Sequence, residues 1–386
     1  MKTQRRAPTQ SLRGTTAKFK SNRTQCDIVA VARRRGGGSR YWCLEHRADA
    51  TAKYGWPQSV CRAAHIATDS GQAKELSLNF YRGPVALWGA VPAVYDTTRL
   101  RPDDGIHVHA RKTPKDKKEI DFTYHCLRLT GSNLPAKGVE VNAVDAIYYM
   151  VSSVFGFDTR LVRCTHCGEP HLDRDWFSVH PHHRHLCAAC GRTFVDSTRG
   201  IGNPIVGLRA ALGLKSQRTV RAAKTLAISQ ADYPGGMQVW GSNAALVWTG
   251  EGAEEEGIHV HAFKSGNTDP EHPDLDDTFS EVTIDGIKLD PVMVRLLMAQ
   301  NTLPHLKDRV ISLICGKCGE AVFDTGERAF TPVARRACAG CGAVVKGRGR
   351  KRKTIGNPLP AILEQLAASA PRAPQTFKLS LLPETP

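Results

Sequence analysis

The sequence predicts an α+β protein in which two tandem units share one order of elements: strands, helix, cysteine cluster, helix. Three recurring features indicate this: a four-cysteine spacing, a six-residue run with two histidines, and the tetrapeptide Ile-Gly-Asn-Pro. The predicted units span 74–222 and 223–370. A basic disordered arm (1–25) and a small Cys/His-rich module (26–73) precede them, and a proline-rich tail (371–386) follows.

The cysteine cluster occurs twice with identical spacing. In each, nineteen residues separate two Cys-x-x-Cys pairs, and the second cluster follows the first at an offset of 151 residues. Structural Zn²⁺ takes four ligands in a tetrahedron, and two thiolates two residues apart reach one ion from a tight turn. The sequence therefore predicts two structural zinc ions, with these ligands: Cys164, Cys167, Cys187 and Cys190; Cys315, Cys318, Cys338 and Cys341.

A glycine follows each Cys-x-x-Cys pair, which predicts a turn that needs positive φ. These are Gly168, Gly191, Gly319 and Gly342. Histidines between the first cluster's pairs have no histidine counterpart in the second, so we expect all-cysteine ligation. Disulfides would instead require an oxidising compartment. Residues 1–23 are basic and polar without the apolar core of a signal peptide, so we expect a reducing, cytoplasmic location.

This arrangement resembles the zinc-ribbon group, over 164–190 and again over 315–341. Zinc ribbons occur in transcription factors, transposases, RNA-processing enzymes and purely structural inserts. The resemblance therefore implies zinc, and it does not select one activity.

The module 26–73 offers a further set of ligand types. Two interpretations stay open for it: a third zinc site, or a small core with buried thiols. The ligands of such a third site would be Cys26, Cys43, His46 and Cys61.

Charge favours a polyanionic partner. The chain has 53 Lys and Arg against 37 Asp and Glu, a formal net charge of +16, which points to nucleic acid, DNA or RNA. No run approaches eighteen apolar residues, so no membrane span is expected. Two basic stretches are the predicted phosphate-binding surface: Arg33, Arg34, Arg35 and Arg40; Lys346, Arg348, Arg350, Lys351, Arg352 and Lys353. The alternative for each stretch is a solvated loop without a ligand.

The run Gly-Ile-His-Val-His-Ala is identical at 105–110 and 257–262. As a strand it places both imidazoles on one face and Ile and Val on the other. The candidate residues are His107, His109, His259 and His261. Three interpretations remain: a strand with hydrogen-bonded histidines, a metal or catalytic site, or a nucleic-acid contact. An active site would also need carboxylates, and Asp121, Asp277 and Asp285 follow the runs at unmatched spacings.

Capping residues and prolines predict where helices start. Helices are expected at 143–153, 204–212, 292–301 and 358–368. Glycine-rich phosphate loops and a Gly-x-Ser-x-Gly elbow are absent from the sequence, which argues against enzymatic activity without excluding it.

The leading hypothesis is a zinc-containing nucleic-acid-binding protein that works as a subunit or accessory factor of a larger nucleoprotein machine. The alternatives are a metal-dependent hydrolase or nuclease centred on the histidine runs, and a structural adaptor that binds protein partners.

Overall fold

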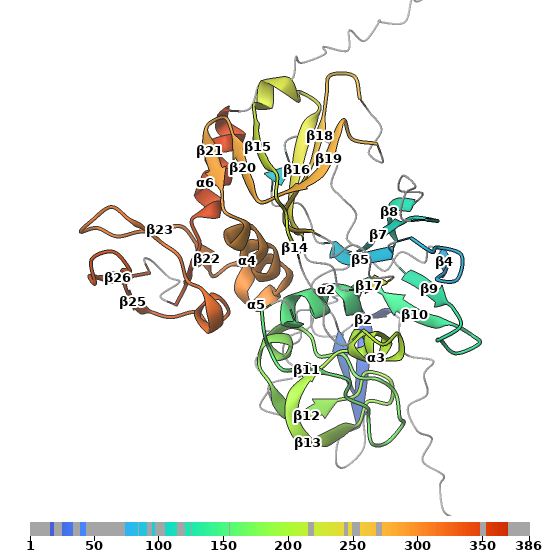
Figure 1. Cartoon of the computed structure of the whole chain (residues 1–386). Coiled ribbons are helices and arrows are strands. Elements are labelled where there is room, and N and C mark those ends of the chain that lie inside the picture. Colours follow the sequence, from blue (N-terminus) through green and yellow to red (C-terminus); the bar gives the residue numbers. More distant parts are fainter. Residues whose placement is uncertain are drawn as a thin grey trace, which may run out of the picture.

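The computed structural model describes residues 74–369, with gaps, and the backbone of three strands nearer the N-terminus: β1 (Thr16–Lys18), β2 (Gln25–Arg33) and β3 (Ser39–Cys43). The gaps are 84, 91–94, 97–104, 114–119, 125, 154, 215–219, 243–245, 249–254, 268–271 and 348–352. The described part is a mixed α+β structure of small sheets and few helices (Figure 1).

Two sheets contain the histidine runs as inner strands. The first has the order β17-β5-β7-β8 and the second β14-β18-β16-β6, with β19 also paired to β18. The bounds in the first are β5 (Val85–Ala90), β7 (Gly105–Ala110), β8 (Ile120–Tyr124) and β17 (Leu246–Trp248). Those in the second are β6 (Tyr95–Asp96), β14 (Val220–Arg221), β16 (Gly236–Ser242), β18 (Glu255–Phe263) and β19 (Leu275–Phe279).

These two sheets exchange a strand in each direction. β6 follows β5 in the chain but pairs with β16, where Tyr95 lies opposite Val239. β17 follows β16 but pairs with β5, where Leu246 lies opposite Leu87. Main-chain hydrogen bonds therefore join the two halves of the molecule at two places, and neither sheet is complete without the other half.

Five helices lie in the described residues: α2 (Ala143–Ser153), α3 (Pro204–Ala211), α4 (Pro291–Thr302), α5 (Pro304–Lys307) and α6 (Leu359–Ser369). The four expected helices are confirmed to within about a residue at each end. The side chain of Asp290 accepts from the backbone N–H groups of Val292 and Met293 and so caps α4.

The asparagine of each Ile-Gly-Asn-Pro tetrapeptide caps one helix and bonds to a second helix. Asn203 Oδ1 accepts from the N–H of Ile205 and caps α3, while its Nδ2 donates to the carbonyl of Asp145 in α2. Asn357 caps α6 in the same way and donates to the carbonyl of Met293 in α4. Each buried asparagine thereby ties a late helix to the helix that covers the sheet.

Smaller sheets complete the fold. β4 (Lys74–Ser77), β9 (Cys126–Thr130) and β10 (Val139–Asn142) form one with the order β10-β9-β4. β15 (Thr225–Ile228), β20 (Glu281–Ile284) and β21 (Ile287–Leu289) form another with the order β15-β20-β21. In both sheets the central strand, β9 or β20, runs parallel to the strand that comes first in the chain, β4 or β15. It runs antiparallel to the strand that comes last, β10 or β21.

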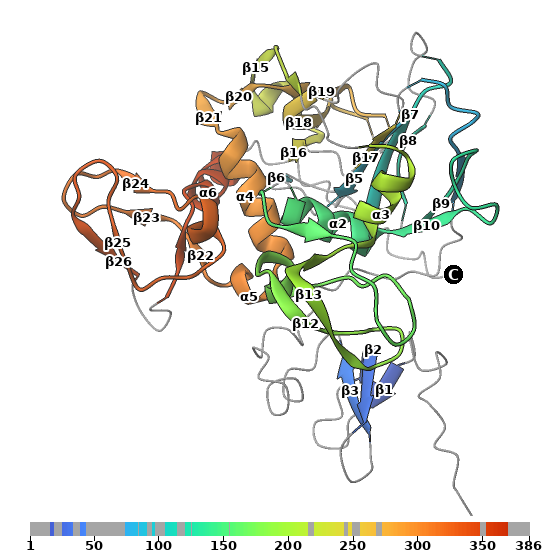
Figure 2. The same ribbon diagram turned by 60° about the horizontal axis from the view of Figure 1, so that its bottom comes forward.

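Each cysteine cluster lies in its own lobe, outside the two larger sheets (Figures 1 and 2). The first contains β11 (Thr159–Arg160), the 3₁₀ turn η3 (Asp175–Val179), β12 (His182–Leu186) and β13 (Thr193–Gly202). The second contains β22 (Val310–Ile311), β23 (Leu313–Ile314), β24 (Ala321–Val322), η5 (Gly326–Ala329), β25 (Arg335–Ala337), β26 (Val344–Lys346) and β27 (Ile355–Gly356).

Aromatic and polar contacts link these lobes to the opposite half of the chain. Phe330, beside η5, packs on Phe155 and Phe157, which follow α2. In the reverse direction, His305 of α5 bonds to the buried carboxylate of Asp175 in η3. Each half of the chain therefore contacts the other half through its cysteine lobe as well as through its exchanged strand.

Some expectations fall on residues outside this description. The tail 371–386 lies there, as does most of the arm 1–25, although β1 belongs to that segment and pairs with β2. No helix among the described residues is both long and apolar enough to cross a membrane.

The helices approach the sheets closely at two glycines. A Cβ built on Gly89 in β5 would lie 2.5 Å from the Cα of Ile147 in α2. A Cβ on Gly241 in β16 would lie closer still to Cγ of Arg295 in α4. Real Cβ atoms do not approach other heavy atoms this closely, so each glycine sets how near its helix lies to the sheet.

We predict that Gly89→Ala destabilises the fold, because the added methyl group meets helix backbone that cannot rotate away. Overpacking of this kind lowers the free energy of unfolding by about 1–3 kcal/mol. Denaturant unfolding of the purified protein measures this. Gly316→Ala is the control, since a Cβ there meets nothing within 4 Å, and equal unfolding midpoints for the two variants would contradict the prediction.

Candidate metal centres

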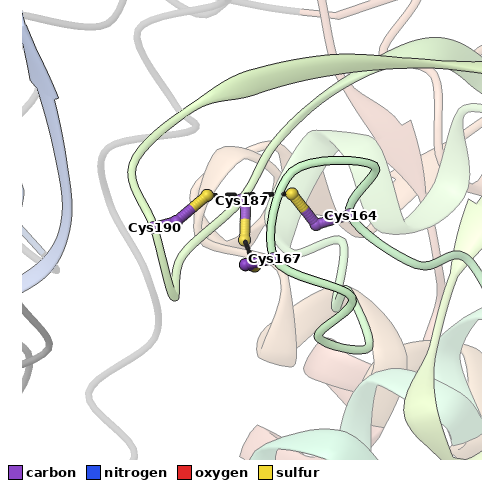
Figure 3. A group of neighbouring side chains, drawn as sticks. All are labelled: Cys164, Cys167, Cys187 and Cys190. Carbon is purple, nitrogen blue, oxygen red and sulfur yellow. Dashed lines mark hydrogen bonds between the residues drawn. The ribbon is translucent and has the colours of Figure 1, made fainter. Parts of the chain in front are cut away.

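The first cysteine cluster converges on one point from two turns (Figure 3). Sγ of Cys164 lies 3.7 Å from Sγ of Cys190, and Sγ of Cys167 lies 3.6 Å from Sγ of Cys187. A disulfide would bring two sulfurs to about 2.0 Å, whereas four sulfurs about 2.3 Å from a zinc ion lie about 3.8 Å apart. The spacing is thus that of a tetrahedral thiolate site.

The second cluster has the same dimensions. The Sγ distances are 3.6 Å for Cys315 to Cys341 and 3.6 Å for Cys318 to Cys338. All four turns are alike: the glycine after each pair donates its N–H to the carbonyl of the first cysteine, at 2.8 to 2.9 Å. These glycines have φ between 67° and 77°, which confirms the expected positive φ.

In the second cluster the first turn favours a thiolate at Cys315. The backbone N–H groups of Cys318 and Lys317 donate to the sulfur of Cys315 and lower its pKa to about 6. At Cys318 the N–H of Glu320 has the same effect, but contacts with the neighbouring thiols outweigh it and raise the pKa to about 12. One thiolate is therefore stable alone, and a cation is needed to keep all four deprotonated.

The histidine runs adopt the predicted strand geometry. Ile106 and Val108 in β7, and Ile258 and Val260 in β18, are fully buried on one face. On the other face Nε2 of His107 lies 2.9 Å from Nε2 of His109.

The second run repeats this contact, because Nε2 of His259 lies 2.9 Å from Nε2 of His261. In each run the two imidazoles therefore point one nitrogen toward a shared position.

The structure also brings the two histidine pairs together. The ring of His107 lies 6.3 Å from that of His261, and the ring of His109 lies 6.2 Å from that of His259, between centroids. Trp88 packs 4.6 Å from His109. On the other sheet, the indole of Trp240 lies 4.8 Å from His261, also between centroids. The four histidines thus form one cluster, flanked by an indole from each sheet, a convergence that the sequence did not predict.

Threonines fix the orientation of the first histidine ring of each run, His107 and His259. Nδ1 of His107 is 3.1 Å from Oγ1 of Thr123 in β8, and Nδ1 of His259 is 3.0 Å from Oγ1 of Thr278 in β19. A histidine that binds a metal through one nitrogen commonly donates its other N–H to an oxygen. Both rings have this arrangement, with Nε2 directed into the cluster.

A carboxylate accompanies the second pair. Oδ1 of Asp276 lies 3.3 Å from Nε2 of His259 and 3.4 Å from Nε2 of His261. One ligand atom from each of these three residues lies within 4.8 Å of the others. The three side chains could therefore hold a metal ion together.

The strand register corrects the expectation that no carboxylates occur at matched positions. In the antiparallel ladders Asp121 lies opposite His109 and Asp276 lies opposite His261. The sequence concealed this match, because the segments that join the strands differ in length. Two other carboxylates lie elsewhere: Asp277 bonds to Lys224, and Asp285 accepts from Ser229 and Gln230.

Most of the predicted phosphate-binding residues, and much of the N-terminal module, fall outside the described structure. Arg34, Arg35, Arg348, Arg350, Lys351 and Arg352 lie there, as do His46 and Cys61. Backbone positions alone are described for Arg33, Arg40, Cys26 and Cys43, in β2 and β3. Lys346 and Lys353 are exposed on the second cysteine lobe, and Arg335 lies directly opposite Lys346 in the β25–β26 ladder.

A buried aspartate anchors each cysteine lobe to its Ile-Gly-Asn-Pro segment. Asp173 accepts from the N–H of Gly202 at 2.7 Å, and Asp324 accepts from the N–H of Gly356 at 2.7 Å. Nε of Arg336 lies 3.1 Å from Asp324, and both side chains are almost fully buried. The arginine therefore supplies the positive charge that a buried carboxylate requires.

Comparison with known proteins identifies no family: no protein-family model, no curated protein and no solved structure matches this chain. Its function has to be inferred from its own geometry and charge.

We predict that Arg336→Met is strongly destabilising, because it leaves the carboxylate of Asp324 buried without a cation. Breaking one side of a buried pair costs about 3–5 kcal/mol. Urea unfolding measures the loss. Arg335→Met is a matched control on the adjacent, exposed arginine, and if both variants unfold at the same urea concentration the pair does not hold the lobe.

Proposed function

We propose that the protein is a metal-dependent hydrolase that cleaves phosphodiesters in nucleic acid, with two cysteine-bound zinc ions as structural supports. The observation that carries this is the convergence of two His-x-His strands, β7 and β18, on one cluster between two sheets. In each case the neighbouring strand places an aspartate opposite the second histidine.

The repeated contacts support an origin by tandem duplication. The tetrapeptide hydrogen bonds, the small sheets and the turns at the cysteine pairs recur in both halves with the same pairing pattern. The reciprocal strand exchange is the arrangement that two copies related by a pseudo-twofold axis would have. On this proposal the units are 74–222 and 223–370, and the histidine cluster lies where the two copies meet.

The cluster divides into two half-sites with the same residue types. His259, His261 and Asp276 form the first, in which the ligand atoms lie close together. His107 and His109 form the second. Asp121 in β8 lies opposite His109, just as Asp276 in β19 lies opposite His261. Two imidazoles and one carboxylate leave coordination positions open for water and substrate, as in catalytic metal sites.

Two such ions held side by side would supply the chemistry of phosphodiester hydrolysis. One ion would lower the pKa of a bound water and the other would stabilise the leaving oxygen. Solvent can reach the cluster, since 14% of the His259 side chain and 20% of the Asp276 side chain are exposed. A purely structural metal site is usually closed by four protein ligands, so this partial exposure favours a reactive centre.

Charge supports nucleic acid as the substrate. The net charge of +16 raises the local concentration of a polyanion. On the second cysteine lobe Arg335 and Lys346 lie opposite each other on neighbouring strands, a pairing that is destabilising unless an anion lies between them. The exposed Lys353 continues this surface.

The first test removes one histidine from each half-site. We predict that His107→Ala with His259→Ala lowers the turnover of a phosphodiester by more than about 100-fold, because removing even a residue that only hydrogen-bonds a metal ligand costs about 10–100-fold. Hydrolysis of bis(p-nitrophenyl) phosphate and of single- and double-stranded DNA and RNA, with Mg²⁺, Mn²⁺ or Zn²⁺, measures this.

The control is His183→Ala, which removes an exposed histidine of β12. Circular dichroism and metal analysis accompany each assay. A folded wild-type protein without activity on any of these substrates would refute the hydrolase. A double variant that keeps full turnover would refute the assignment of its centre.

The second test concerns nucleic-acid binding. We predict that replacing the six cations of 346–353 with Gln weakens binding to all sequences alike and flattens its salt dependence. The slope of log K against log salt should fall by about 0.9 for each phosphate of duplex DNA that the variant no longer neutralises. The control variant is Arg184→Gln with Arg192→Gln, which removes exposed cations from the first cysteine lobe. An unchanged salt slope in the six-fold variant would refute this surface.

A further inference from the structure

The first cysteine lobe contains a second group of ligand-type side chains, separate from its cysteines. Oδ1 of Asp173 lies 2.8 Å from Nε2 of His171 and 3.3 Å from Nε2 of His182, and its Oδ2 lies 3.2 Å from Nδ1 of His185. Three imidazole rings thus direct a nitrogen at one carboxylate.

This group is buried. The residues His171, Asp173 and His185 are 5%, 5% and 1% exposed. One ligand atom from each of the three lies within 4.8 Å of the others. The group is also closely packed, since the rings of His171 and His185 lie 5.1 Å apart and that of Phe194 lies 5.5 Å from His171.

The second lobe shows what the aspartate alone requires. At the offset of 151 residues, Asp173 corresponds to Asp324 and His185 to Arg336. Both aspartates accept the same 2.7 Å bond from a tetrapeptide glycine. A single arginine neutralises Asp324, and the positions of His171 and His182 are valines in that lobe. One cation is therefore enough to anchor a lobe, and the three histidines exceed that need.

Their geometry fits a metal ion. Ligands about 2.0–2.1 Å from a tetrahedral Zn²⁺ lie about 3.3–3.4 Å apart, so the contact of Asp173 with His185, at 3.2 Å, already has this separation and the contact with His171, at 2.8 Å, would lengthen by about 0.5 Å around an ion. Imidazole with carboxylate is a ligand set that Zn²⁺ and Co²⁺ accept. The group is buried, which favours a structural ion, and three protein ligands leave the fourth position of the tetrahedron to a non-protein ligand.

We propose that His171, Asp173 and His185 bind a Zn²⁺ ion that the second lobe lacks, with His182 holding the carboxylate of Asp173. The ion joins the segment after the first cysteine turn to β12 and, through Gly202, to the start of α3. In the first lobe the ion has the anchoring role that the Asp324–Arg336 ion pair has in the second lobe. This site is independent of the proposed hydrolase activity.

The test converts the first lobe to the residues of the second: His171→Val, His182→Val and His185→Arg together. The introduced arginine can pair with Asp173 as Arg336 does with Asp324, so the variant should keep its fold. We expect zinc bound per chain, measured by mass spectrometry of dialysed protein, to fall by one. His183→Ala, on the same strand, should leave the zinc content unchanged. An unchanged zinc content in the folded triple variant would overturn the proposal.

Cobalt substitution tests the site without relying on that variant. In protein carrying His107→Ala and His259→Ala, which disrupts both half-sites of the histidine cluster, Co²⁺ bound by nitrogen and oxygen should still give visible absorption beyond that of the thiolate sites. Asp173→Asn in this background should remove the added absorption and lower the cobalt content by one. Cobalt confined to the thiolate sites before that last substitution would show that the group is only a hydrogen-bonded network.

Discussion

The exchange of β6 and β17 is the constraint from which the central geometry follows. Each of these short strands leaves its own sheet and adds to the other, so the two sheets are fixed to each other by main-chain hydrogen bonds. β7 and β18, as inner strands beside β5 and β16, are thereby held with their histidine faces toward each other. The helices α2 and α4 cover the sheets at Gly89 and Gly241 and complete the two layers.

Local features of this fold were predictable because their signals are local. Capping residues and prolines located the helices, alternation located the buried faces of β7 and β18, and cysteine spacing located the two thiolate clusters. Each of these signals lies within a few residues of the structure it specifies, so a comparison of short segments could find it.

The composition of the sites was harder to predict because it depends on pairings between distant segments. Asp276 belongs to the histidine cluster through the register of β18 with β19, and connections of unequal length hide its match to Asp121. His171 and His185 are among the histidines of the first cluster that have no histidine counterpart in the second. Their spacing in the sequence does not indicate that they meet at Asp173, and only the folded lobe brings these side chains together.

The exchanged strands also have a mechanical consequence. Moving the two histidine-bearing strands apart would require breaking the ladders between β6 and β16 and between β17 and β5, so the backbone sets the separation of β7 and β18. Were the cluster to hold metal ions, as proposed, a frame of this kind would favour ions and bridging groups that match its span, since others would require the ladders to move.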